Sequence, residues 1–199
     1  GRYIKINNVF KSIPSQLAKE NKKFMISKIN KDASLAKYND AITWLMDYGL
    51  IDKCHNLITP SFPLDGYLTE NIFKIYMCDT GLFMASLSFD SISSILLDDM
   101  GIYKGAVYEN VIADAFIKNN KPLYYYSRES GLEIDFVTTI NNEIYIIEVK
   151  SRNGNSKSAK EVLTNKKRYP NVKGLIKLTD TNVSKIGNIK TIPLYLAFL

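Results

Sequence analysis

The sequence predicts a small helical domain followed by a mixed α/β domain. The spacing of apolar residues changes along the chain from the period of a helix to that of a strand. The 199 residues are enough for one large domain or two small ones. Hydrophobic residues make up 46% of the chain and charged residues 23%, as in an ordinary globular protein. We place the two domains at residues 1–61 and 62–199.

The first domain is predicted to contain two helices and a small β-hairpin. A short helix starts near Ser12, and a longer helix runs from a cap at Ser34 to a stop at Gly49. The hairpin consists of Ile51–Cys54 and Leu57–Thr59. Two helices and a β-wing are typical of a winged-helix domain, which either binds DNA or acts as a rigid spacer.

The longer helix favours the spacer. Asp40 and Asp47 lie beside only one cation, Lys37, which makes a poor surface for phosphates. Trp44 on the same helix is expected to lie in the core or at an interface with another domain.

The second domain is predicted to alternate strands with helices, with loops at 98–99 and 152–155. A connector at 61–68 comes first. Strands are expected at 73–77, 132–137, 144–150 and 174–178, with a last edge strand at 192–196, and helices at 79–87, 105–116 and 157–169.

Two carboxylates and a lysine gather at the ends of apolar strands. Glu148 and Lys150 are two apart in one strand and therefore project to the same face. If this strand pairs with the preceding one across Asn141-Asn142, Asp135 lies beside Glu148. Such a group is costly unless it binds something or pairs internally. Oxygen ligands suit Mg²⁺ or Mn²⁺, and a nearby lysine suits a phosphate.

A third carboxylate precedes this pair. Glu109 lies beside the apolar stripe of the helix at 105–116, and Glu133, two residues before Asp135, is its substitute. The order of helix with Glu, strand with Asp, strand with Glu-x-Lys, helix and strand resembles the PD-(D/E)XK nuclease superfamily, which includes restriction endonucleases and Holliday-junction resolvases. The resemblance covers 104–178 and implies a restriction-endonuclease-like sheet flanked by helices. The alternative is a surface ion pair of Glu148 with Lys150 and a turn capped by Asp135.

Several stretches along nearly the whole chain resemble a second group. They are Phe10–Leu17, Lys22–Phe24, Ala41–Leu45, Gly49–Ile51, Lys74–Leu82, Leu123–Tyr126 and Glu148–Ser151. The group is the C-terminal region of bacterial and archaeal AAA-type ATP-binding proteins. There, an ATPase module comes first, and a linker of winged-helix character and a nuclease-like domain of unknown function follow it.

The sequence contains no Gly-x-x-x-x-Gly-Lys-Ser/Thr segment and so no phosphate-cradling P-loop. The start at Gly1-Arg2-Tyr3, without Met, is expected of a C-terminal fragment. The resemblance then implies that ATP binds only to the missing N-terminal half, and that this ATPase domain is a partner of the chain.

The net charge of +6 is compatible with nucleic acid but does not diagnose it. Lys157, Lys160, Lys166 and Lys167 follow the carboxylates on the helix at 157–169, where a DNA backbone running past the site would meet them. The other interpretation of this cluster is a solvated helix face. We favour a solvated face for the earlier lysines at 19–31.

Cysteine and histidine are scarce. Cys54 and Cys78 are far apart without ligand spacing, which predicts a reduced, cytoplasmic protein. The single histidine, His55, argues against a histidine metal site or triad. No apolar run approaches the roughly 20 residues that cross a bilayer, so no membrane partner is expected.

Two classes of function follow. In the first, Asp135, Glu148 and the Val149 carbonyl hold a metal that activates water and polarises a scissile phosphate, while Lys150 stabilises the charge that develops there. Glu109 holds a second metal or orients the water. In the second class, the same domain is a non-catalytic interaction or regulatory module of the ATPase.

Overall fold

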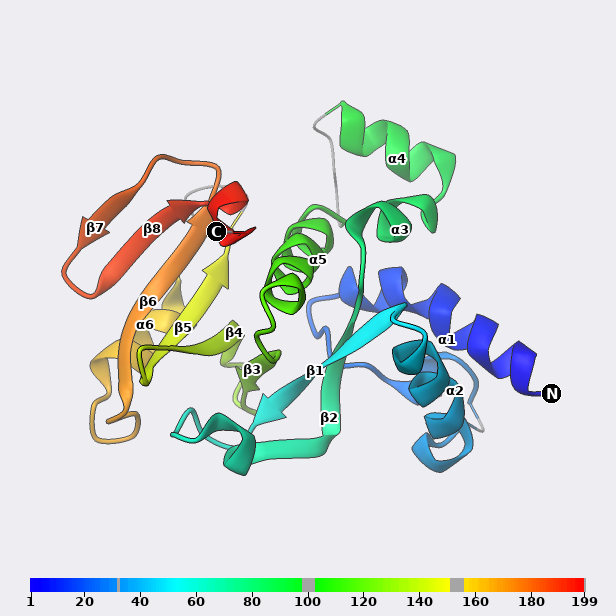
Figure 1. The fold of residues 1–199 in the computed structure, drawn as a ribbon, viewed down its shortest axis with the longest axis horizontal. Helices are drawn as coiled ribbons and strands as arrows, with labels where there is room; N and C mark the ends of the chain where they lie inside the picture. The colour runs from blue at the N-terminus through cyan, green and yellow to red at the C-terminus, as the bar shows by residue number, and fades with distance from the viewer. Residues whose placement is uncertain (32, 98–102, 151–155, 199) are drawn as a thin grey trace. The chain divides into compact units, whose positions relative to one another are not determined.

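The computed structural model describes residues 1–31, 33–97, 103–150 and 156–198 (Figure 1). The loops predicted at 98–99 and 152–155 lie outside these residues. The elements are α1 (Arg2–Leu17), α2 (Leu35–Asp47), β1 (Ile51–Leu57), β2 (Leu68–Met77), α3 (Thr80–Ala85), α4 (Phe89–Leu96), α5 (Tyr103–Lys118), β3 (Tyr124–Ser127), β4 (Glu133–Ile140), β5 (Glu143–Val149), α6 (Lys157–Thr164), β6 (Val172–Thr179), β7 (Ser184–Ile186) and β8 (Ile189–Pro193). Short 3₁₀ turns lie at Ile26–Lys28, Leu64–Tyr67 and Leu194–Phe198.

The strands form a mixed sheet in the order β2-β1-β3-β4-β5-β6-β8-β7. Pairing is antiparallel for β3–β4, β4–β5 and β7–β8, and parallel for β1–β3, β5–β6 and β6–β8. The predicted mixed α/β class is therefore confirmed.

The chain divides into two compact units that interleave in sequence. Unit 1 contains Gly1–Lys53 and Phe73–Asp114, and unit 2 contains Cys54–Ile72 and Ala115–Leu199. This division differs from the predicted boundary at residue 61. The change from helical to strand periodicity predicts a single boundary along the chain. The chain instead passes between the two units three times, so no single boundary separates them.

Unit 1 contains the packed helices α1 and α2. The buried residues include Val9 and Ile13 of α1 and Ile42 of α2. The end of α2 is as predicted: Gly49 has φ +64°, and the N–H of Leu50 donates to the Leu45 carbonyl at 2.9 Å, as in a Schellman motif. The start predicted for the short helix is wrong, because α1 already begins at Arg2.

The predicted hairpin after α2 is also wrong. The two segments assigned to it belong largely to one strand, β1, whose residues 54–57 have no positive φ that would mark a tight turn. The residues buried in this strand include Ile51, Cys54 and Leu57. Its neighbour β2, and not a second arm within 51–59, provides the other strand.

Unit 2 contains the predicted β4–β5 hairpin. Asn141 and Asn142 have φ of 51° and 63°, the left-handed values that a two-residue type I′ turn requires. Ala159 and Val162 of α6 pack in one cluster with Ile146 of β5 and Leu175 of β6. This cluster places α6 on the sheet face to which these two strand residues point.

Two expectations for unit 2 are corrected. The helix α6 ends at Thr164 and does not reach Tyr169. The last predicted strand occurs as β8, but it is not an edge strand, because β7 pairs along its outer side. The three-residue β7 is too short to show a strand pattern in the sequence.

Candidate metal and phosphate site

The hairpin brings Asp135 and Glu148 to adjacent positions on β4 and β5. Phe136 and Ile147 are Cα partners in this antiparallel pair. Asp135 comes one residue before Phe136 and Glu148 one residue after Ile147, so the two carboxylate residues lie opposite each other. Both residues are buried, with exposed fractions of 8% and 3%. The Asp135 Oδ2 accepts a hydrogen bond from the Val149 N–H at 2.8 Å. The neighbouring positions predicted for the two carboxylates are thus present in the structure.

Lys150 joins the same group. Its Nζ lies 3.0 Å from the Glu148 Oε2, and the lysine side chain is 34% exposed while the glutamate side chain is 4% exposed. The Lys150 N–H donates to the Leu178 carbonyl at 2.9 Å, which anchors the residue to β6 after β5 has ended. The arrangement is a buried carboxylate with a cation that reaches solvent.

The donor set suits a hard divalent cation that keeps several waters. In the described part of the chain, no three His, Cys, Asp or Glu side chains converge as a metal-binding group. The two carboxylates and the Val149 carbonyl would then leave remaining positions to water or substrate. Mg²⁺ is commonly bound in this way, through one or two carboxylates and substrate phosphates.

Glu109 lies in unit 1, and its carboxylate contacts residues of that unit. Oε1 pairs with the Lys22 ammonium, Oε2 accepts from the Tyr76 hydroxyl at 2.9 Å, and the Lys74 Nζ lies 3.7 Å away. Glu109 is 2% exposed. Burial raises the pKa of this carboxyl, but the charges of Lys74 and Lys22 and the hydrogen bonds outweigh burial and hold the pKa below its ordinary value. Sequence spacing gave no sign of these partners.

The four lysines predicted to contact phosphate do not form one helix face. Lys157 and Lys160 are exposed on α6, whereas Lys166 and Lys167 follow its end. The Lys166 Nζ donates to the Val172 carbonyl at 2.5 Å. The structure therefore presents a shorter basic helix followed by a basic turn.

Lys177 is a cation near the site that the sequence interpretation missed. It is the Cα partner of Glu148 in the parallel β5–β6 pair and is partly buried. The available signal was a lysine in an otherwise apolar core strand, Gly174–Leu178. Only the parallel pairing of β6 identifies its neighbour.

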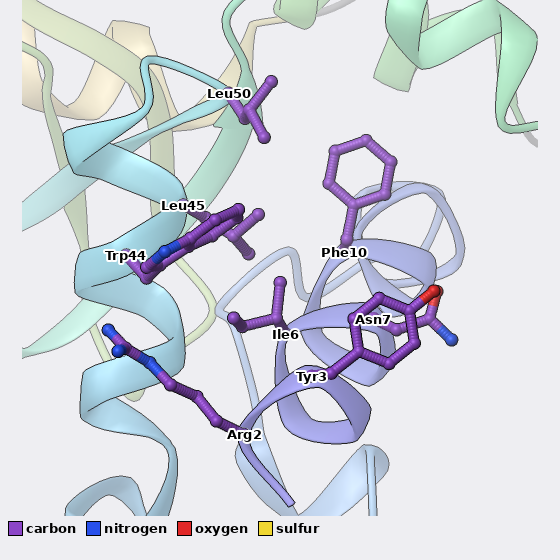
Figure 2. Close-up of a pocket in the computed structure, with 8 residues that line it drawn as sticks. All are labelled: Arg2, Tyr3, Ile6, Asn7, Phe10, Trp44, Leu45 and Leu50. Carbon is purple, nitrogen blue, oxygen red and sulfur yellow. The ribbon is translucent and has the colours of Figure 1, made fainter.

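Unit 1 contains an open apolar pocket of about 460 Å³ between α1 and α2 (Figure 2). The rings of Trp44 and Tyr48 lie 4.2 Å apart. In Figure 2, Trp44 of α2 and Ile6 and Phe10 of α1 border the hollow, with Arg2 at one end. Trp44 is partly exposed here and so does not lie in the core. The residues that line the pocket are Arg2, Tyr3, Ile6, Asn7, Phe10, Trp44, Leu45 and Leu50.

Two family models, both described as domains of unknown function, match separate parts of the chain. DUF8612 matches residues 2–93 and DUF4143 matches residues 104–197. DUF4143 is commonly associated with AAA ATPases, in agreement with part of the predicted resemblance. No curated protein matches the sequence significantly.

A search of solved structures finds similarity to the crystal structure of protein VC1899 from Vibrio cholerae. The identity is 10% and the TM-score 0.30, with 99% of this chain and 50% of the other covered. The chain thus spans half the length of that protein, and the TM-score is too low to establish a shared fold. As for membranes, no described helix combines the length and apolar character that a bilayer span needs.

Proposed function

We propose that unit 2 is a metal-dependent phosphodiesterase of restriction-endonuclease-like fold that acts on DNA. The observation that supports this best is the meeting of two buried carboxylates, Asp135 and Glu148, with the partly exposed Lys150. Burying two carboxylates side by side is unfavourable, because like charges repel and both lose hydration. A divalent cation would offset both costs.

The residues divide into metal ligands and a charge stabiliser. Asp135, Glu148 and the Val149 carbonyl would hold Mg²⁺ or Mn²⁺. When bound, such an ion polarises a phosphoryl oxygen and lowers the pKa of a water molecule. Lys150 stabilises the negative charge that develops on the phosphoryl oxygens. In the hydrolysis, a water oxygen bonds to phosphorus, the bond to the leaving sugar oxygen breaks, and that oxygen takes up a proton.

The rest of the proposal concerns the parent protein. A winged-helix-like spacer at residues 1–61 would connect this nuclease-like domain to an N-terminal AAA-type ATPase module. The association of DUF4143 with AAA ATPases supports that arrangement. The exposed Lys157, Lys160 and Lys167 are available to contact DNA phosphates.

The test is a cleavage and metal-binding series on the 199-residue chain. With Mn²⁺ or Mg²⁺ and plasmid DNA, the wild type should cleave, and Asp135→Ala should lose cleavage and metal binding together. Lys150→Ala should lose cleavage but keep most of the metal affinity, because the ammonium contacts phosphate and not metal. Lys173→Ala, an exposed lysine paired with Glu143, is the matched control and should retain both.

The cleavage result decides the proposal in the parent protein as well. If the isolated chain is inactive, the same substitutions are made in the ATPase-containing protein, where the missing module is present. Cleavage there that survives both Asp135→Ala and Lys150→Ala would refute the nuclease assignment.

A non-catalytic interaction module is the second candidate function. It is favoured by the apolar pocket of unit 1, where aromatic residues are accessible to a partner. It is also compatible with the site of unit 2, because Glu148 already pairs with Lys150 and Asp135 already accepts the Val149 N–H. This function would be favoured if the wild-type chain binds no divalent metal and the Asp135→Ala variant of the parent protein keeps its ATPase regulation.

A further inference from the structure

A polar row crosses one face of the sheet at the carboxyl end of β5 and β6. Glu148 pairs with Lys177, and Lys177 pairs with Thr191 of β8. Two residues earlier on the same strands, Ile146 pairs with Leu175, and both belong to the apolar cluster that contains Ala159 and Val162 of α6. Because residues two apart in a strand share a face, Glu148 and Lys177 also project to the α6 side.

Lys177 is distinguished from the other lysines of unit 2 by its surroundings. It is partly buried, and among the described residues no carboxylate lies within ion-pair distance of its Nζ, although Glu148 is its Cα partner. Glu148 directs one oxygen to Lys150 instead. The Lys177 Nζ is not among the buried side-chain nitrogens that lack a partner, so the ammonium reaches solvent and is available to an anion.

The first turn of α6 lies at the same end of the sheet. The Ser158 Oγ accepts from the N–H of Glu133, the first residue of β4, at 3.4 Å. Ser156, the residue directly before α6, occupies the N-cap position, is 3% exposed and makes no capping hydrogen bond. Its Oγ has no hydrogen-bond partner among the described residues. A helix N-terminus with unused N–H groups and a spare hydroxyl favours an anion.

We propose that Lys177 and Ser156 form a second phosphate-binding position, one strand away from Lys150, for a backbone phosphate next to the scissile one. This inference rests on the proposed function for its ligand, a nucleic-acid phosphodiester. The charges agree with it. Asp135 and Glu148 balance Lys150 and Lys177, so a bound divalent cation leaves the group with two positive charges for phosphates.

The test measures DNA affinity against salt concentration, with a 20-base-pair duplex and no divalent metal. Lys177→Gln should weaken binding and make the slope of log K against log salt shallower by about 0.9, the value for one lost phosphate contact. Lys177→Arg should keep the slope. Lys190→Gln is the matched control: Lys190 is exposed on β8 and pairs with Ile176, so it projects to the opposite face.

Ser156→Ala separates ligand binding from folding. Removing a buried hydroxyl that has no hydrogen-bond partner in the described part of the chain should leave the melting temperature unchanged or raise it. The variant should nevertheless bind the duplex more weakly. If Lys177→Gln matches Lys190→Gln in affinity and slope, or if the wild type does not bind the duplex at low salt, the inference is overturned.

The outcome also separates this inference from the proposed function. Duplex binding that depends on Lys177, without any Mn²⁺-dependent cleavage in the chain or its parent, would reject the phosphodiesterase and retain the phosphate position. If Lys177→Gln changes neither cleavage nor the salt dependence of DNA binding, the phosphate position is rejected and the phosphodiesterase is retained.

Discussion

The buried carboxylate of Glu109 allows a stability prediction whose size follows from its surroundings. Glu109→Gln removes the negative charge that faces the fully buried Lys74 and also pairs with Lys22. Breaking a buried ion pair by removing one partner costs about 3–5 kcal/mol, because the remaining charge stays desolvated. We therefore expect unit 1 to lose about that much free energy of unfolding at pH 7.

The matched control is a surface ion pair in unit 2. Glu161 lies 3.4 Å from Arg128 and its side chain is 51% exposed, so Glu161→Gln should cost about 0–1 kcal/mol. The assay is urea unfolding followed by circular dichroism, which reports on both units, and by tryptophan fluorescence. The chain contains a single tryptophan, Trp44, which belongs to unit 1 and so reports on the unit that contains Glu109.

The same carboxylate predicts a pH dependence. Its pKa in the folded protein is lower than the ordinary value of 4.5, so its contribution to stability is complete above that value and is lost as the pH falls through the lower, folded-state pKa. The stability difference between the wild type and Glu109→Gln should therefore shrink when the pH drops below about 4.5.

Two results would refute this reasoning. The first is a loss for Glu109→Gln no larger than that for Glu161→Gln. The second concerns the double variant Glu109→Leu with Lys74→Met. It replaces the closely facing buried charges by apolar groups and should be more stable than Glu109→Gln alone. If the double variant is the less stable one, the cost does not come from breaking the buried pair of Glu109 with Lys74.

Three further predictions concern unit 2. Gly174→Ala should cost about 1–3 kcal/mol in urea unfolding, because a Cβ there would come within 2.7 Å of the Asn188 carbonyl oxygen; an unchanged midpoint would contradict this. Asn142→Ala should cost about 1–2 kcal/mol, since alanine tolerates φ of 63° poorly, whereas Asn142→Gly should not destabilise. Burial and the hydrogen bond with Tyr169 raise the pKa of Tyr126 to about 12. Stability should thus fall from about pH 10 to 12 in the wild type and fall less in Tyr126→Phe, as measured by alkaline unfolding curves.

Local sequence patterns predicted the parts of the site that are close along the chain. Asn141-Asn142 marked the turn, and the apolar residues on either side marked the two strands, so the neighbouring positions of Asp135 and Glu148 followed from hairpin geometry alone. The stop of α2 at Gly49 was predictable for the same reason, because a left-handed backbone position favours glycine. The hairpin expected within 51–59 failed because short apolar segments fit one strand as well as two.

The sequence by itself determined the mixed α/β class, the β4–β5 hairpin and the meeting of Asp135, Glu148 and Lys150 at its end, because turn chemistry and strand alternation act over a few residues. Tertiary structure decided the rest. The parallel pairing of β5 with β6 placed Lys177 beside Glu148 across an intervening helix, and long-range packing gave Glu109 its partners Lys22 and Lys74. Such contacts depend on which distant segments bury their apolar faces together. Periodicity along the chain shows which face of an element is apolar, but not which other element packs against it.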